Sequence, residues 1–192
     1  MIRTLNLVNS MDLKQGGPPE VIRNLKKSLN KDQKKIISVM SLVRLRTTTI
    51  LKLIFIKKAR SKFFKFLNKY DIIHAHSIWS FKVAFFCYFA NSLGIKVIFS
   101  SHGYLDDWSM SHSVLKKKFF YFLVLKKLFL RSYIFFSNIG EYQDSKSKFS
   151  YADKFVIPNG ISLDIFKKNY KKKIFEKKKI IYFGRIHEKK GI

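Results

Sequence analysis

Three of the five histidines lie on or directly after segments predicted to be buried strands. His74 and His76 belong to the apolar segment 72–76, and His102 follows the segment 96–101. One of the first two is expected to face the core, and His76, nearer the strand end, is the better site candidate. His102 is either a site residue at the strand end or a loop histidine with structural hydrogen bonds. No carboxylate or thiol set at ligand spacing accompanies them, so no metal site is expected.

A glycine-proline segment, Gly16-Gly17-Pro18-Pro19, follows the first predicted strand and runs into a helix. Proline near the first helical position is favoured, because its missing N–H costs nothing there. Gly17 stands where a backbone can pass close to a ligand, with N–H groups at a helix start available for phosphate. The alternative is a tight turn in which glycine supplies a positive φ. The residues alone leave both open.

Apolar periodicity and turn residues predict the elements that must position these groups. Strands are predicted over residues 5–9, 35–42, 72–76, 96–100, 133–136, 154–157 and 179–183. Helices are predicted from Pro18–Glu20 to residue 29 and over 47–70, 80–93, 114–131 and 141–149. This alternation predicts an α/β fold: a Rossmann-like parallel sheet with helices on both faces. Ligands of such sheets bind beyond the carboxyl ends of the strands, where Gly17 and His102 fall.

An ordered set of motifs spans the chain, each at the end of a predicted strand. They are Gly16-Gly17-Pro18-Pro19, the segment 71–76 with Trp79, Ser101-His102-Gly103, Val156-Ile157-Pro158-Asn159-Gly160-Ile161, and Tyr182-Phe183-Gly184-Arg185 leading to Lys189-Lys190-Gly191. In this order they resemble the N-terminal domain of the family 4 (group 1) glycosyltransferases. The resemblance implies the N-terminal half of a GT-B fold and a retaining transfer of a hexose-type sugar from a nucleotide sugar.

The resemblance also implies roles for individual residues. His102 would be catalytic, near the anomeric carbon of the donor, by positioning and electrostatic support rather than covalent attack. Gly16, Gly17 and His76 would bind substrate. Arg185 and Lys190 would grip the donor diphosphate, which lets the fold dispense with a metal; no cofactor is expected beyond the nucleotide sugar as donor substrate. Without the other motifs, both cations would count as ordinary surface charges of a lysine-rich chain.

Three regions are expected along the chain. Residues 1–166 would form the acceptor-side domain, residues 167–178 a basic linker, and residues 179–192 the start of a donor-binding domain. The family's paired-glutamate motif lies beyond this sequence, so we expect a truncated form that is inactive alone. Ser162 replaces the acidic residue usual after the Asn-Gly-Ile step, and the segment 137–141 is a blurred version of the family's Thr-Ser-Glu turn.

The charge is extreme, with 39 basic and 12 acidic residues and a net charge of +27. Such an excess favours anionic surfaces, although a lysine-rich composition can also arise from drift. The family resemblance implies assembly of cell-envelope polysaccharide or lipopolysaccharide as the setting, and the basic surface suits a lipid-linked acceptor. We expect a cytoplasmic protein bound peripherally to the inner face of the membrane. The alternative is a non-catalytic basic α/β domain that binds a membrane surface or nucleic acid; no recognised nucleic-acid motif supports the latter, so no specific nucleic-acid partner is expected.

Two apolar runs have a structural interpretation. The single cysteine, Cys87, is expected to be a small buried hydrophobe, and it excludes an intrachain disulfide. The helix over residues 114–131 mixes lysines with aromatic residues. Its aromatic residues are expected mainly in the core, while its lysines dock on a membrane.

Overall fold

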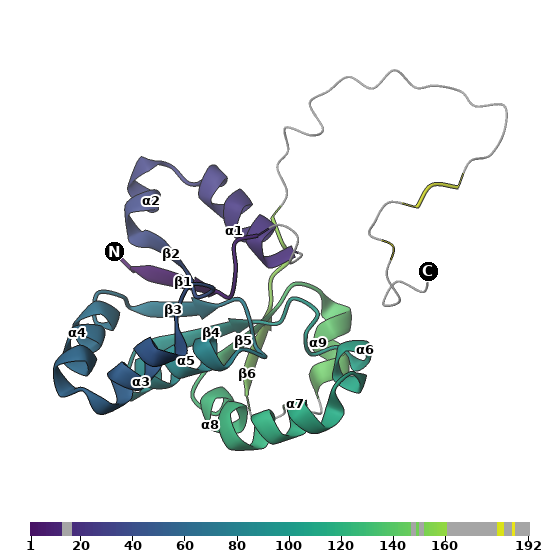
Figure 1. Cartoon of the computed structure of the whole chain (residues 1–192). Helices are drawn as coiled ribbons and strands as arrows, with labels where there is room; N and C mark the ends of the chain where they lie inside the picture. Colours follow the sequence, from purple (N-terminus) through teal and green to yellow (C-terminus); the bar gives the residue numbers. More distant parts are fainter. Residues whose placement is uncertain (13–16, 147–148, 150–151, 161–179, 183–185, 187–192) are drawn as a thin grey trace. The chain divides into compact units, whose positions relative to one another are not determined.

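The computed structural model describes residues 1–12, 17–146, 149, 152–160, 180–182 and 186 (Figure 1). The chain divides into two compact units, residues 1–160 and 161–192. All regular elements of the described residues belong to the first unit. The predicted boundaries at 166–167 and 178–179 lie outside the described residues. Ile180–Tyr182, the described part of the strand predicted over 179–183, are irregular, and no described strand pairs with them.

The first unit is built on one sheet of six parallel strands, in the order β2-β1-β3-β4-β5-β6. The strands are β1 Thr4–Val8, β2 Ile37–Ser41, β3 Ile72–Ala75, β4 Lys96–Ser100, β5 Tyr133–Phe136 and β6 Asp153–Val156. The parallel register places Asn6 of β1, an interior strand next to the edge strand β2, between Val39 and His74. The α/β prediction is confirmed.

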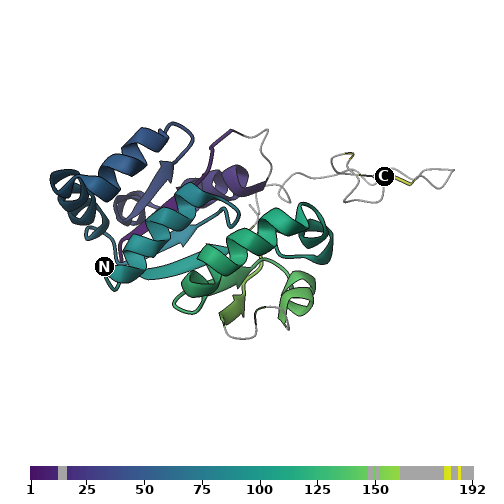
Figure 2. The ribbon, with the colours of Figure 1, turned by 60° about the horizontal axis from the view of Figure 1, so that its bottom comes forward.

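Helices connect successive strands. They are α1 Gly17–Ser28, α2 Lys31–Ile36, α3 Thr47–Phe55, α4 Lys57–Leu67, α5 Phe81–Ser92, α6 Asp107–Ser111, α7 Val114–Phe120, the π-helical turn η2 Tyr121–Leu125, α8 Lys126–Phe129 and α9 Ile139–Lys146. Along the strand order, the chain moves in one direction from β1 to β2 and in the opposite direction from β2 through β6. Because parallel crossovers are right-handed, the helices of these two parts cover opposite faces of the sheet. Figure 2 shows α5 and the continuous helix of α7, η2 and α8 over one face, where α5 contacts α8, with α1 behind the sheet.

Two predicted elements are wrong in their bounds. Residues 31–36 are helical, so β2 is shorter than the predicted strand 35–42. Asn30 caps this helix, with its side chain accepting from the Gln33 backbone N–H and the Gln33 side chain accepting from the Asn30 N–H. This capping box satisfies two N–H groups that have no partner inside the helix, and it outweighs the apolar signal of the segment that follows.

The helix predicted over 47–70 is two helices. Ile56 between α3 and α4 is extended, with φ −101° and ψ 107°. No proline or glycine marks the break. The break lets each helix bury its own residues, Ile50 from α3 and Phe63 and Leu67 from α4.

The core lies mainly between the sheet and α5. Cys87 is fully buried there, as predicted, and Phe86 meets the Phe63 ring edge-on, with 4.8 Å between the centroids. Such an aromatic pair stabilises by about 0.5–1.5 kcal/mol beyond its buried area. The pair joins α4 to α5, and α5 in turn packs on β3 and β4, the strands whose following loops carry the site.

The helix of α7, η2 and α8 only partly follows its prediction. Leu125, Leu128 and Phe129 are buried, but Leu115, Phe119 and Phe122 are 83%, 70% and 62% exposed. The expectation that its aromatic residues lie mainly in the core is therefore wrong for Phe119 and Phe122. Within the part of the chain that the structure describes, no helix has the length and apolarity to cross a bilayer.

Candidate functional site

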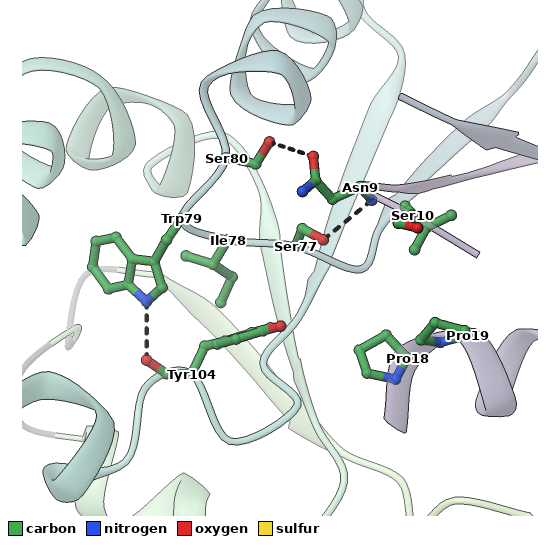
Figure 3. A pocket seen from close by; sticks show the side chains of 10 residues that line it. Asn9, Ser10, Pro18, Pro19, Ser77, Ile78, Trp79, Ser80 and Tyr104 are labelled. Carbon is green, nitrogen blue, oxygen red and sulfur yellow. Dashed lines mark hydrogen bonds between the residues drawn. The ribbon is translucent and has the colours of Figure 1, made fainter. Parts of the chain in front are cut away.

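A small pocket opens at the carboxyl edge of the sheet, where the loops after β1, β3 and β4 meet the start of α1 (Figure 3). Its volume is about 130 Å³. Ligand pockets usually measure about 300 Å³ or more, so this one has room for only a part of such a ligand. The lining residues are Val8, Asn9, Ser10, Pro18, Pro19, Ser77, Ile78, Trp79, Ser80 and Tyr104.

Hydrogen bonds between these loops fix the pocket wall. Trp79 Nε1–H donates to the Tyr104 carbonyl over 3.1 Å, and Ser80 Oγ–H donates to Asn9 Oδ1 over 3.4 Å. Lys117 Nζ lies 5.4 Å from the Trp79 ring centroid, in cation–π range. Burial raises the pKa of the Tyr104 hydroxyl, so this group stays protonated at neutral pH. Hydroxyls, an amide and two aromatic rings therefore face one space, a wall suited to a polar, uncharged ligand.

The start of α1 forms the opposite wall. Gly17 is its first helical residue and has no positive φ, so the tight-turn alternative is wrong for Gly17. Pro18 and Pro19 follow and line the pocket. Because proline has no N–H, two of the donors that a helix start normally offers to an anion are missing. The acidic Glu20 stands in the same turn. The start of α1 therefore offers fewer N–H donors to a phosphate than the sequence predicts.

Next to the pocket, three imidazoles gather at the ends of β3 and β4. The His74 and His76 rings lie on one side of the sheet with centroids 4.2 Å apart, as residues two apart on a strand must. His76 Nδ1 lies 3.0 Å from His102 Nε2, and His76 Nε2 lies 3.0 Å from Asn6 Oδ1. His74 Nε2 is 2.6 Å from Ser100 Oγ. His76 is 2% exposed, and both its ring nitrogens are engaged, so its available role is to hold His102.

Burial keeps these imidazoles neutral. Desolvation, with a smaller contribution from His102, lowers the pKa of His74 to about 4, and desolvation alone lowers the pKa of His102 to about 4. Burial, together with the charges of its two neighbours, holds the pKa of His76 well below its usual value. Burying a cation without a counter-charge is costly, so the uncharged form prevails at neutral pH.

His102 sits in a strained turn. The Tyr104 N–H donates to the Ser101 carbonyl over 2.8 Å, and the two residues between them, His102 and Gly103, have φ of 45° and 76°. Glycine adopts this left-handed region freely, but for histidine it costs about 1–2 kcal/mol. Residues held in such conformations cluster at functional sites, which supports a functional role for His102.

The carboxylate of Glu141 holds the turn that contains His102. It accepts a hydrogen bond from Ser101 Oγ–H over 2.7 Å and another from the Leu105 N–H over 3.4 Å. Asn138 holds the Glu141 backbone, because its Oδ1 accepts from the Glu141 N–H over 2.8 Å. Burial raises the pKa of Glu141 despite these hydrogen bonds. Glu141 thus links α9 to the loop that carries His102.

The structure brings together some of the predicted site residues. His76 and His102 are hydrogen-bonded, and Gly17 begins the helix that lines the pocket. Gly16, Arg185 and Lys190 lie outside the described residues. Sequence reasoning missed Asn6, whose signal was a polar residue inside a buried apolar strand, and Glu141, noted only within a degraded motif. In the described ranges, no three His, Cys, Asp or Glu residues are grouped to hold a metal ion.

A parallel α/β sheet with a pocket and strained loops at its carboxyl edge defines a Rossmann-like ligand-binding domain. A family model, Glycosyltransferase Family 4, matches residues 21–165. The chain belongs to this family, which confirms the resemblance in its motifs. Membership in this family implies sugar transfer as the class of activity. It also implies a sugar donor and an acceptor, in general terms, as partners. A search of the curated proteins found no match to the chain.

Proposed function

We propose that this chain forms the acceptor-side domain of a retaining glycosyltransferase, which passes a hexose-type sugar from a nucleotide sugar to a cell-envelope glycan or lipid-linked acceptor. The observation that carries the proposal is the site itself: an uncharged pocket beside the neutral, strained His102, within a family 4 domain. His102 positions the reacting groups, and Trp79 and Tyr104 offer flat faces to a sugar ring.

The donor diphosphate is assigned to Arg185 and Lys190. Negative charge grows on the diphosphate as the glycosidic bond breaks, and two fixed cations stabilise that charge. Their charge supplies what a divalent metal supplies in other transferases, so the proposed reaction needs no metal. The prolines at the start of α1 support this division, because they leave that wall short of anion-binding N–H groups.

The acceptor is proposed to be presented at a membrane. Leu115, Phe119 and Phe122 stand at i, i+4 and i+7 on α7 and η2, so they form one exposed apolar stripe. Exposed lysines of the same helix flank it: Lys116, Lys118, Lys126 and Lys127. An apolar stripe bordered by cations suits the interface of an anionic bilayer, the inner face of the cytoplasmic membrane in this proposal.

Transfer is tested by release of nucleoside diphosphate from UDP-glucose, UDP-N-acetylglucosamine and GDP-mannose with lipid-linked glycans as acceptors. The assay uses this chain and, in parallel, the chain extended by the coding sequence downstream. We expect turnover with retained anomeric configuration in the extended form. Arg185→Ala should abolish it, whereas Arg131→Ala, an exposed arginine at the end of the α8 segment, should not. Absence of turnover in both forms, with the fold intact, would contradict the transferase proposal.

Membrane docking is tested by co-sedimentation with vesicles of phosphatidylglycerol and phosphatidylcholine. Binding should weaken as salt screens the lysines and should be lost on pure phosphatidylcholine. Phe119→Ser should lower the affinity about tenfold or more, since burying one phenylalanine stabilises by about 1.5–3 kcal/mol. Phe55→Ser on α3 is the matched control, because Phe55 is similarly exposed at 79% but lies on another helix. An equal loss with both variants would show that no particular face docks.

A further inference from the structure

A chain of hydrogen bonds runs from the middle of strand β1 to His102. Asn6 on β1 is 1% exposed, and its Nδ2 lies 3.2 Å from the Ser38 carbonyl oxygen of β2. A carbonyl oxygen only accepts, so the Asn6 group that faces it must be the NH₂. The other end of the amide, Oδ1, therefore faces His76. The backbone of β2 fixes the orientation of the Asn6 amide.

The direction of the remaining bonds follows from this orientation. Asn6 Oδ1 only accepts, so His76 Nε2 carries the proton. A neutral imidazole has one N–H, and the pKa of His76 lies well below neutral pH, so His76 Nδ1 is unprotonated. His102 Nε2, 3.0 Å away, must then be the donor to it. His102 is neutral as well, which leaves its Nδ1 as an unprotonated nitrogen.

The second ring nitrogen of His102, Nδ1, is therefore a hydrogen-bond acceptor. Among the described residues, Nδ1 of His102 has no hydrogen-bond partner. An unprotonated ring nitrogen accepts a hydrogen bond from a hydroxyl, and it repels the oxygen atoms of a phosphate that has no proton to donate. The pocket beside it also favours a hydroxyl group over a phosphate, because its wall is made of hydroxyls, an amide and aromatic rings.

We propose that Asn6 and His76 are positioning residues that fix His102 in the Nε2–H tautomer, so that its Nδ1 binds a hydroxyl group of the sugar or acceptor rather than a phosphate. The identity of the hydroxyl rests on the proposed function. The tautomer does not, because it is a property of the chain without substrate. A neutral imidazole in this tautomer also serves as the acceptor for a hydroxyl proton during transfer.

The tautomers are read directly from two-bond ¹H–¹⁵N correlation spectra of the ¹⁵N-histidine-labelled chain at neutral pH. Both His76 and His102 should show a protonated Nε2 and an unprotonated Nδ1. Asn6→Leu removes the acceptor for His76, so His76 is free to donate from Nδ1 and the His102 signals should shift towards the Nδ1–H tautomer.

Asn91→Ala is the matched control. It removes an asparagine side chain that donates to Ser132 Oγ over 3.2 Å, outside the histidine chain. Its His102 signals should not change. Inorganic sulfate, an oxyanion with no proton to donate at neutral pH, should leave the Nδ1 signal of His102 unchanged, and methyl α-glucoside should shift it. A wild-type His102 with a protonated Nδ1, or an Asn6→Leu spectrum identical to wild type in a folded protein, would overturn the inference.

The two proposals fail separately. The predicted tautomers with no turnover in the extended chain would contradict the proposed function and leave the hydrogen-bond chain standing. Turnover with a protonated His102 Nδ1 would overturn the inference and leave the transferase standing. A loss of kcat in Asn6→Leu, with unchanged folding and with the shifted His102 tautomer, would support both.

Discussion

The buried imidazoles make the stability of the domain depend on pH, and we predict a loss of about 4 kcal/mol between about pH 7 and about pH 5 from His74 and His102. Each has a pKa of about 4 in the folded state, against 6.5 for the free side chain. The folded state therefore binds fewer protons than the unfolded state in this range. Their contribution is fully present above pH 6.5 and is lost as the pH falls from 6.5 towards 4.

The magnitude follows from these two values. At about pH 5 the unfolded imidazole is almost fully protonated and the folded one is mostly neutral, a difference of about 2 kcal/mol for each histidine. Both rings keep some contact with water, so about 4 kcal/mol for the pair is an upper limit. Glu141 acts in the opposite direction, because burial raises its pKa and its protonation favours the folded state. Since typical domains are stable by about 5–15 kcal/mol, the expected loss is large.

Urea denaturation at the two pH values, followed by tryptophan fluorescence, measures this difference. His74→Phe keeps a ring of similar shape but cannot titrate, so it should lower the loss between the two pH values by up to about 2 kcal/mol. His112→Gln is the matched control, because it removes an exposed imidazole outside the cluster and should keep the dependence intact. A wild-type stability that is equal at both pH values, or an undiminished dependence in His74→Phe, would refute the reasoning.

Three further predictions concern single positions. Glu141→Ala should lower the free energy of unfolding by about 1–3 kcal/mol, because the Ser101 hydroxyl and the Leu105 N–H lose their buried acceptor. Glu141→Gln should lower the free energy of unfolding by less. Equal losses in the two variants would contradict the role of the carboxylate oxygen atoms. Gly94→Ala should cost about 1–2 kcal/mol in the same denaturation assay, since Gly94 has a φ of 75° and nothing lies near an added Cβ. The Cys87 thiol should react with a thiol reagent only after unfolding, because burial raises its pKa; prompt reaction of the native protein would contradict this.

The sheet was largely predictable because short apolar runs in the sequence indicate buried parallel strands. Residues 72–76, 96–100 and 133–136 were predicted within one residue of their observed bounds. The errors arose where local hydrogen bonds compete with apolar pattern. The Asn30–Gln33 capping box makes α2 from a segment that reads as the start of a strand. The break at Ile56 has no sequence marker, because tertiary burial of Ile50 and Phe63 decides it.

The site was predictable in its location but not in its contacts. Strand ends and the family motifs place His76 and His102 at one edge of the sheet. Their hydrogen bond depends on the register of β3 against β4, which no local pattern encodes. The same holds for Glu141, which reaches Ser101 across 40 positions of sequence. Roles that depend on a partner from another strand could not be read from spacing alone.

Asn6 shows how such a residue could be found. A buried parallel strand is normally a continuous apolar run, and the polar residue in Leu5-Asn6-Leu7-Val8 interrupts it. A buried amide without partners would cost several kcal/mol, so its presence implies partners on both neighbouring strands. Those partners are the Ser38 carbonyl on one side and His76 on the other. A buried polar residue on an interior strand of a parallel sheet therefore marks a hydrogen-bond network, and here that network ends at Nδ1 of His102, beyond the carboxyl ends of the strands.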